Sequence, residues 1–141
     1  MNTSIILDTG PLVALVSRDD RDHTWAKSIW ATLTPPLLTC DAVIVESCFL
    51  LRNLYGGEES IFRLLDRNVI QLNFDLAAEH PAIRSLIQQY KSVPMSVADA
   101  CLVRMSELDR NSSILTLDSD FLIYRRNRSQ TIPTIMPSRK I

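Results

Sequence analysis

The sequence predicts an α/β protein in which helices cover both faces of a mostly parallel sheet of four to five strands. Short runs of large aliphatic residues alternate with longer amphipathic stretches along the chain, which is typical of parallel sheets. The composition, 46% hydrophobic and 22% charged, is that of an ordinary globular protein. Because 141 residues suffice for one core and no repeat or linker interrupts them, we expect a single domain over residues 1–141.

The first half of the chain predicts two strands and four helices. Pro11 suits the first turn of a helix, Pro35 and Pro36 end the second helix, and Gly56 and Gly57 form a turn. The predicted strands are Ser4 to Leu7 and Leu37 to Cys40, and the predicted helices run from Gly10 to about Ser17, His23 to Leu33, Asp41 to Leu54 and Glu58 to Asp66.

The second half predicts two helices and two or three strands. The helices run from Asp75 to Tyr90, with a local irregularity at Pro81, and from Ser96 to about Leu108; the strands are Val69 to Phe74 and Ser113 to Leu117. Ile132 to Ile135 is a further candidate. It belongs at an edge of the sheet, because Pro133 has no N–H to donate to a central ladder.

Charge and cysteine usage exclude several classes of protein. The net charge is −1 and the pI about 6.1, so the protein has no overall positive charge that would predict a DNA-coating role. A local cluster of basic residues that binds phosphates is still compatible with this charge. Cys40, Cys48 and Cys101 lack zinc-ligand spacing and are expected to be free thiols in a reducing compartment. No apolar run reaches membrane-spanning length, so we expect a cytoplasmic protein without a membrane partner.

Four segments place acids among apolar neighbours. Asp8 ends the first strand in "SIILDTGPLVAL", and Glu46 interrupts the apolar helix "AVIVESCFLL". Asp99 lies in "SVADACLV", and Asp118 and Asp120 follow the fourth strand in "ILTLDSDF". Burying a charge is costly unless it is paired or binds a metal, so these positions are candidates for a charged site.

The predicted topology brings these acids to one edge of the sheet. Ligands bind beyond the carboxyl ends of parallel strands, where Asp8 and Asp118 lie, and the helices that contain Glu46 and Asp99 begin at the same edge. Crowded carboxylates repel one another, and Mg²⁺ or Mn²⁺ relieves this repulsion by taking oxygen ligands. Such an ion can activate water for attack on a phosphate, so the acids predict metal-dependent phosphoryl chemistry.

Most of these acids also have a local structural explanation. Asp8 could cap the helix that starts near Pro11, and Asp118 could cap the turn that follows it. Ser96 and Asp99 match a capping box, in which the two side chains serve the helix terminus itself. Each explanation is reasonable alone, but four such positions at one edge of the sheet favour a shared site.

Glu46 has no capping explanation, because it lies inside its helix. The structural alternative is a buried ion pair with Arg52 or another arginine. No Ser/His/Asp arrangement competes with the acids, since His23 and His80 do not lie at strand ends.

The motifs "IILDTGPLVAL", the helix around Glu46, "SVADACLV" and "LTLDSDF" resemble, in this order and spacing, the acidic motifs of PIN-domain nucleases. The resemblance covers essentially the whole chain and is closest in layout to the VapC-type toxins of toxin–antitoxin pairs. It implies a three-layer α/β/α PIN-like fold and an Mg²⁺- or Mn²⁺-dependent endoribonuclease. Asp8, Glu46, Asp99 and Asp118 would form its catalytic, metal-binding quartet, and Asp120 could share the role of Asp118.

The resemblance also implies partners and supporting residues. Its members cut RNA, commonly form homodimers, and are inhibited by a small antitoxin that inserts a segment near the acidic pocket. Thr116 would orient a carboxylate. The sequence departs from the family mildly at Gly10 and Pro11, where many toxins carry small polar residues.

Other functions fit the residues less well. A haloacid-dehalogenase phosphatase needs a second Asp where Gly10 stands, and a response-regulator receiver needs a late Lys and leaves Glu46 and Asp99 unexplained. Nucleotide-binding glycine motifs are absent. The remaining alternative is a PIN-fold module that binds RNA or protein without cutting it.

Basic and aromatic residues could contribute to RNA binding. Candidates for phosphate contacts are the segment 124–128 ("YRRNR"), Arg104 and Arg110, with an ordinary solvated surface as the equal alternative. Trp25 and Trp30 could form a stacking or dimer surface, but core packing is the better prediction.

Overall fold

Five parallel strands form the central sheet of the computed structural model, which describes residues 3–138. Their order across the sheet is β3-β2-β1-β4-β7, with the first strand in the middle. The strands are β1 (Ser4–Leu7), β2 (Leu37–Thr39), β3 (Ile70–Leu72), β4 (Ser112–Leu115) and β7 (Thr134–Ile135). In the central register Ser4 is opposite Ser112 and Leu7 is opposite Leu115, so β1 and β4 end together at one edge. The predicted parallel sheet is confirmed.

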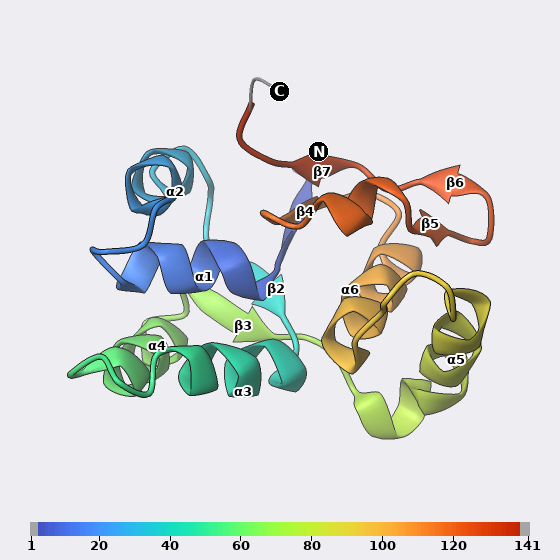
Figure 1. The fold of residues 1–141 in the computed structure, drawn as a ribbon, viewed down its shortest axis with the longest axis horizontal. Helices are drawn as coiled ribbons and strands as arrows, with labels where there is room; N and C mark the ends of the chain where they lie inside the picture. Colours follow the sequence, from blue (N-terminus) through green and yellow to red (C-terminus); the bar gives the residue numbers. More distant parts are fainter. Residues whose placement is uncertain (1–2, 139–141) are drawn as a thin grey trace.

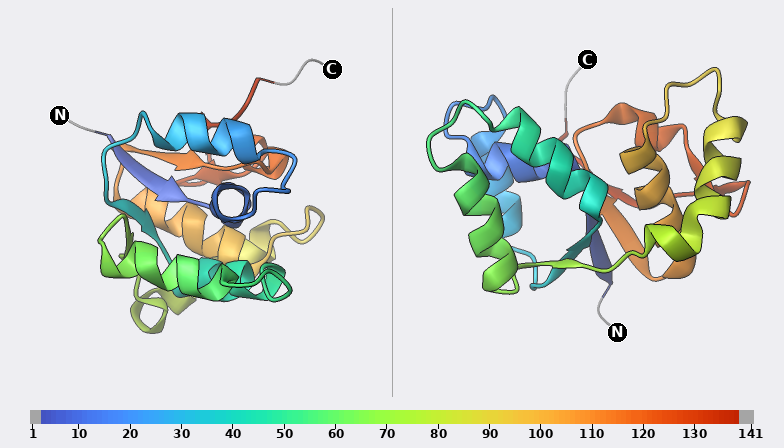
Figure 2. Two further views of the ribbon diagram at one scale, coloured as in Figure 1. Left: turned by 90° about the vertical axis from the view of Figure 1, so that its left-hand side faces the viewer. Right: turned by 90° about the horizontal axis from the view of Figure 1, so that it is seen from below.

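Within residues 3–138, six α-helices cover the two faces of this sheet, and the three-layer prediction is confirmed (Figure 1). They are α1 (Thr9–Val16), α2 (His23–Trp30), α3 (Asp41–Leu50), α4 (Gly57–Asp66), α5 (Leu76–Gln89) and α6 (Val97–Leu108). The chain moves outward from β1 to β3 and then returns past β1 to β4. Because parallel crossovers are right-handed, this reversal places α1 to α4 on one face and α5 and α6 on the other (Figure 2).

The core fixes the edge at which β1 and β4 end. Leu7 and Leu115, the last residues of the two strands, are fully buried, and α6 packs against both strands. On the other face α1 packs against α2 and α3. Trp25 and Trp30 pack against the core, as predicted. Within residues 3–138, no helix is long and apolar enough to cross a membrane.

Several element ends differ from the prediction. Helix α3 stops at Leu50 rather than Leu54, and turns lead to Gly56, whose φ of 75° is favourable only for glycine. Strand β4 ends at Leu115 rather than Leu117, and the backbone then turns into the 3₁₀-helix η1 (Ser119–Leu122). The edge strand is shorter than predicted, because Pro133 contributes only its carbonyl, which accepts from the Ile114 N–H at 2.9 Å.

A small hairpin between η1 and β7 was not predicted. Strands β5 (Arg125–Arg126) and β6 (Gln130–Thr131) pair antiparallel across a turn at Asn127 and Arg128. These two residues adopt positive φ angles of 50° and 72°. The turn contains no glycine or proline, so the usual sequence signals of a hairpin are missing.

Candidate active site

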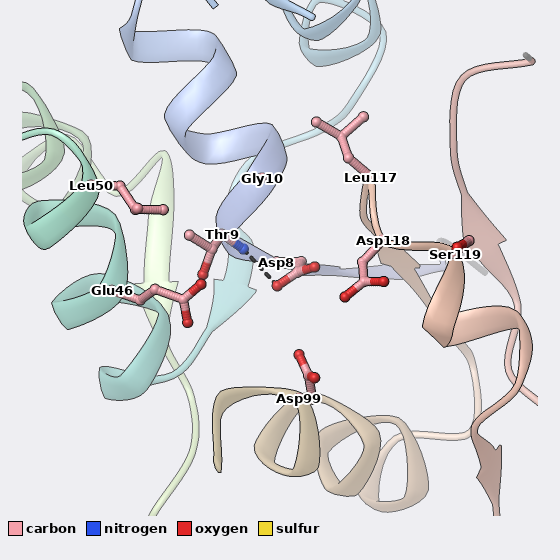
Figure 3. Close-up of a pocket in the computed structure, with 9 residues that line it drawn as sticks. All are labelled: Asp8, Thr9, Gly10, Glu46, Leu50, Asp99, Leu117, Asp118 and Ser119. Carbon is pink, nitrogen blue, oxygen red and sulfur yellow. Dashed lines mark hydrogen bonds between the residues drawn. The ribbon is translucent and has the colours of Figure 1, made fainter. Parts of the chain in front are cut away.

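A pocket of about 440 Å³ opens where β1 and β4 end (Figure 3). Its walls are the first turns of α1 and α6, one side of α3 and the segment that follows β4. The lining residues are Asp8, Thr9, Gly10, Glu46, Leu50, Asp99, Leu117, Asp118 and Ser119. The structure therefore brings together four of the five predicted acids, which come from four separate segments of the chain.

Asp8 is the most deeply buried of these acids, with 7% of its surface exposed. It precedes α1, and its Oδ1 accepts from the Thr9 N–H at 2.7 Å while its Oδ2 accepts from the Thr116 hydroxyl at 2.6 Å. Burial raises the pKa of Asp8 to about 6, with a further contribution from the charges of Asp99 and Asp118, although both hydrogen bonds act in the opposite direction. A carboxylate at this position is costly without a positive partner.

Asp99 forms the predicted capping box at the start of α6. The Asp99 N–H donates to Ser96 Oγ at 3.0 Å, and the Ser96 N–H donates to Asp99 Oδ2 at 3.3 Å. The hydroxyl of Tyr124 also lies 3.2 Å from Asp99 Oδ2. Burial, and to a smaller extent the charge of Asp118, raise the pKa of Asp99 above its ordinary range. Asp99 therefore caps α6 and lines the pocket at the same time.

Asp118 and Asp120 have different positions. Asp118 precedes η1, and its Oδ1 accepts from the Asp120 N–H at 2.9 Å. The Asp118 N–H donates to Thr116 Oγ1 at 2.9 Å, so Thr116 links Asp118 to Asp8. Asp118 lines the pocket, whereas Asp120 lies in the first turn of η1 and is not part of the lining.

Glu46 lies on the exposed side of α3 and faces the other acids across the pocket (Figure 3). Burial of its carboxyl and the charges of Asp99 and Asp118 raise the pKa of Glu46. Arg52, its predicted structural partner, instead lies over the ring of Phe49, 4.1 Å from the centroid, and donates to the Phe49 carbonyl at 2.8 Å.

No cation of the described residues balances this pocket. The ion pairs within residues 3–138 are Arg21–Asp22, Arg63–Glu59, Arg104–Glu79 and Arg104–Glu107, and all of them lie outside it. Among the same residues, no three His, Cys, Asp or Glu side chains gather closely enough to form a ready-made metal site. The donor set still fits Mg²⁺ or Mn²⁺, because these ions prefer oxygen and Mg²⁺ commonly uses one or two carboxylates together with water.

The basic residues that the sequence offered as RNA contacts are partly occupied by internal contacts. Arg104 donates to Glu79 at 2.8 Å and to Glu107 at 3.2 Å. Arg125 donates from one nitrogen to three backbone carbonyls of residues 122–124. Arg110 and Arg128 are exposed.

Tyr124 does not face solvent, contrary to its placement among the RNA contacts. It is fully buried, and burial and the nearby charge of Asp99 raise the pKa of its hydroxyl. The sequence signal that was missed is the spacing of Tyr124 three residues after Phe121, which is typical of one apolar face of a helical turn. Thr9 was also missed as a pocket residue; it lies beside Glu46 in Figure 3.

Comparisons with known proteins agree with this architecture. The sequence matches the PIN domain family over residues 5–127. The structure is similar to the crystal structure of Mycobacterium tuberculosis VapC20, a toxin that cleaves the sarcin-ricin loop, with a TM-score of 0.69 at 23% sequence identity. The match covers 83% of this chain and 92% of that chain, and it supports the same fold. None of the curated proteins compared with this chain matches it.

Proposed function

The chain belongs to the PIN domain family, and we propose that it is a metal-dependent endoribonuclease that hydrolyses RNA phosphodiester bonds. The observation that carries this proposal is the convergence of four carboxylates from four segments on one pocket, with no balancing cation from residues 3–138. The repulsion between these carboxylates raises the free energy of the folded chain, and a bound divalent cation offsets this increase.

The residues that would hold Mg²⁺ or Mn²⁺ are Asp8, Glu46, Asp99 and Asp118. A bound ion would supply activation of water and compensation of the charge that develops on the phosphate oxygens. Thr116 keeps Asp8 and Asp118 in a fixed relation through its two hydrogen bonds. Products with 5′-phosphate and 3′-hydroxyl ends are expected from hydrolysis of this kind.

Among these four acids, Glu46 has the position that is most open to substrate. It is the most exposed acid of the pocket, so water and RNA reach it most easily. The burial and the charges of Asp99 and Asp118 that raise its pKa in the metal-free pocket favour a cation beside it. The exposed Arg110 and Arg128 are candidates for sequence-independent phosphate contacts.

We further propose that the protein is the toxin of a toxin–antitoxin pair, held inactive in the cytoplasm by a small antitoxin and forming a homodimer. The similarity to VapC20 and the exposed apolar side chains on α3 and α4 support protein partners. Val45 and Phe49 lie on the same helix as Glu46, with 69% and 59% of their surfaces exposed. The free thiols Cys40, Cys48 and Cys101 support a reducing compartment.

One observation favours a second candidate function, a PIN-fold module that binds RNA or protein without cutting. Among residues 3–138 the acids are not gathered closely enough to form a preformed three-ligand metal site. A binding module, however, gains nothing from repelling carboxylates in one pocket. Thermal unfolding with and without Mn²⁺ separates the two functions, because only the nuclease requires the ion to bind there.

The direct test is cleavage of structured and single-stranded RNAs in Mg²⁺, Mn²⁺ and EDTA. We expect metal-dependent cutting by the wild type and its loss in Asp99→Asn, which keeps the side-chain shape. Glu107→Gln is the matched control, because Glu107 lies on the same helix but pairs with Arg104. Equal activity in EDTA, or equal loss in both variants, would contradict the proposed metal site.

A further inference from the structure

Tyr124 connects the two segments that carry Asp118 and Asp99. It follows η1, which Asp118 caps, and its N–H donates to the Asp120 carbonyl at 3.0 Å. Its side chain reaches across to the loop before α6 and to the first turn of that helix. The hydroxyl lies 2.8 Å from the Pro94 carbonyl and 3.2 Å from Asp99 Oδ2.

The ring of Tyr124 is held tightly. It is fully buried and makes edge-to-face contacts with Tyr90 and Phe121, with centroid distances of 5.1 and 5.2 Å. Aromatic pairs in this geometry restrict each other's orientation. The hydroxyl is therefore presented to Asp99 from a rigid part of the core rather than from a flexible side chain.

The contact completes the support of the Asp99 carboxylate. Its own helix supplies one donor to Oδ2, the Ser96 N–H, at a long 3.3 Å. The single proton of the Tyr124 hydroxyl is shared between the Pro94 carbonyl at 2.8 Å and this same oxygen at 3.2 Å, so Tyr124 adds a second, bifurcated contact from a different element. Both contacts are made to Oδ2, and together they restrict the rotation of the carboxylate.

We infer that Tyr124 is a positioning residue for Asp99: its hydroxyl holds the carboxylate in the orientation that the pocket requires and ties the start of α6 to the segment of Asp118. The inference rests on the proposed metal site. Partners that orient metal ligands typically contribute about 10–100-fold to metal affinity or activity.

The test compares Tyr124→Phe with Tyr90→Phe, two changes that each remove one hydroxyl from the same ring cluster. The Tyr90 hydroxyl accepts from the Arg125 N–H at 2.8 Å and does not touch Asp99. Binding of Mn²⁺ is measured without RNA, by titration calorimetry and electron paramagnetic resonance. We expect Tyr124→Phe to weaken Mn²⁺ binding and cleavage by about tenfold, and Tyr90→Phe to leave both within about twofold of the wild type.

A double-mutant cycle separates positioning from general packing. In the Asp99→Asn background, Tyr124→Phe is expected to cause no further loss of Mn²⁺ affinity, because its effect acts through the carboxylate. Wild-type affinity in Tyr124→Phe, or an equal loss in both backgrounds, would overturn the positioning role while leaving the nuclease proposal intact. Absence of Mn²⁺ binding by the wild type would overturn the metal site and this inference together.

Discussion

The two ends of α6 place acids in opposite electrostatic surroundings. At its start, Asp99 shares a pocket with Asp8 and Asp118, and burial and mutual repulsion raise its pKa. Near its end, Glu107 accepts from Arg104, which also binds Glu79 of α5. The second oxygen of Glu107 accepts from the N–H of Asn127 at 2.7 Å, which fastens the β5–β6 hairpin.

This difference distinguishes acids that support the fold from acids that are available to a ligand. The paired acids join α5, α6 and the hairpin, so their charges are used within the protein. In the pocket, Asp8, Asp99 and Asp118 are held by backbone N–H groups and hydroxyls, which orient a carboxylate but do not neutralise it. Perturbed, unbalanced carboxylates that line a pocket are the usual sign of a functional site.

The largest expected effect comes from removing one charge from the pocket acids, with the same change in a paired acid as the control. Glu46→Gln is expected to lower RNA cleavage by about a hundredfold, equivalent to roughly 2.7 kcal/mol of transition-state stabilisation. Glu79→Gln, the same change in a paired acid, should leave cleavage within about twofold. Single-turnover cleavage assays measure both variants. Similar losses of cleavage in the two would contradict the distinction between pocket acids and paired acids.

The second prediction concerns the paired end. Arg104→Met leaves Glu79 and Glu107, whose side chains are 21% and 10% exposed, without a cation. We expect a loss of about 2 kcal/mol in the free energy of unfolding, less than for a fully buried pair because water still reaches the site.

Denaturant unfolding in EDTA measures this loss. The control is Arg63→Met, which breaks the exposed pair with Glu59 and should cost less than about 0.5 kcal/mol. A loss in Arg104→Met no larger than this control would show that the cluster does not hold the helices together.

The third prediction is that the pocket destabilises the metal-free protein at neutral pH. The pKa of folded Asp8 is about 6, above its ordinary value of 3.8. The folded state therefore binds the proton of Asp8 more tightly than the unfolded state does. The stabilisation that results is complete below about pH 4 and is lost as the pH rises through 6.

Asp8→Asn removes this dependence and is expected to stabilise the metal-free protein by about 1–2 kcal/mol at pH 7.5. The gain over the wild type should shrink towards pH 4, and unfolding curves in EDTA at both pH values measure it. A constant difference between the two proteins at all pH values would show that Asp8 does not titrate as described.

The smallest expected effect is that of Asp120→Asn, which is compared with the same change at its neighbour Asp118. Asp118→Asn should abolish most cleavage, because Asp118 lines the pocket. Asp120→Asn should lower it by no more than about two- to threefold, as is usual for changes outside a site. An effect of Asp120→Asn as large as that of Asp118→Asn would place Asp120 among the ligands.

Local patterns in the sequence predicted most of the fold. Aliphatic runs predicted four of the five sheet strands and offered the fifth as an edge candidate, and the cap of α6 followed from Ser96 and Asp99 alone. The errors occur where the signal is weak or depends on distant partners. The β5–β6 turn has no glycine, and β4 ends at Leu115 because the chain then leaves the ladder for the 3₁₀-helix η1, which Asp118 caps.

The sequence by itself determined the order of the elements and the placement of acids at the ends of strands and helices, because periodicity and capping act within a few residues. The tertiary structure decided which contacts those acids make. Asp8 meets Thr116 across 108 positions of sequence, and Asp99 meets Tyr124 across 25. Only the packing of distant segments could show that the Tyr124 hydroxyl reaches Asp99, that Arg104 pairs with Glu79 of α5 and that Glu46 has no arginine partner among the described residues.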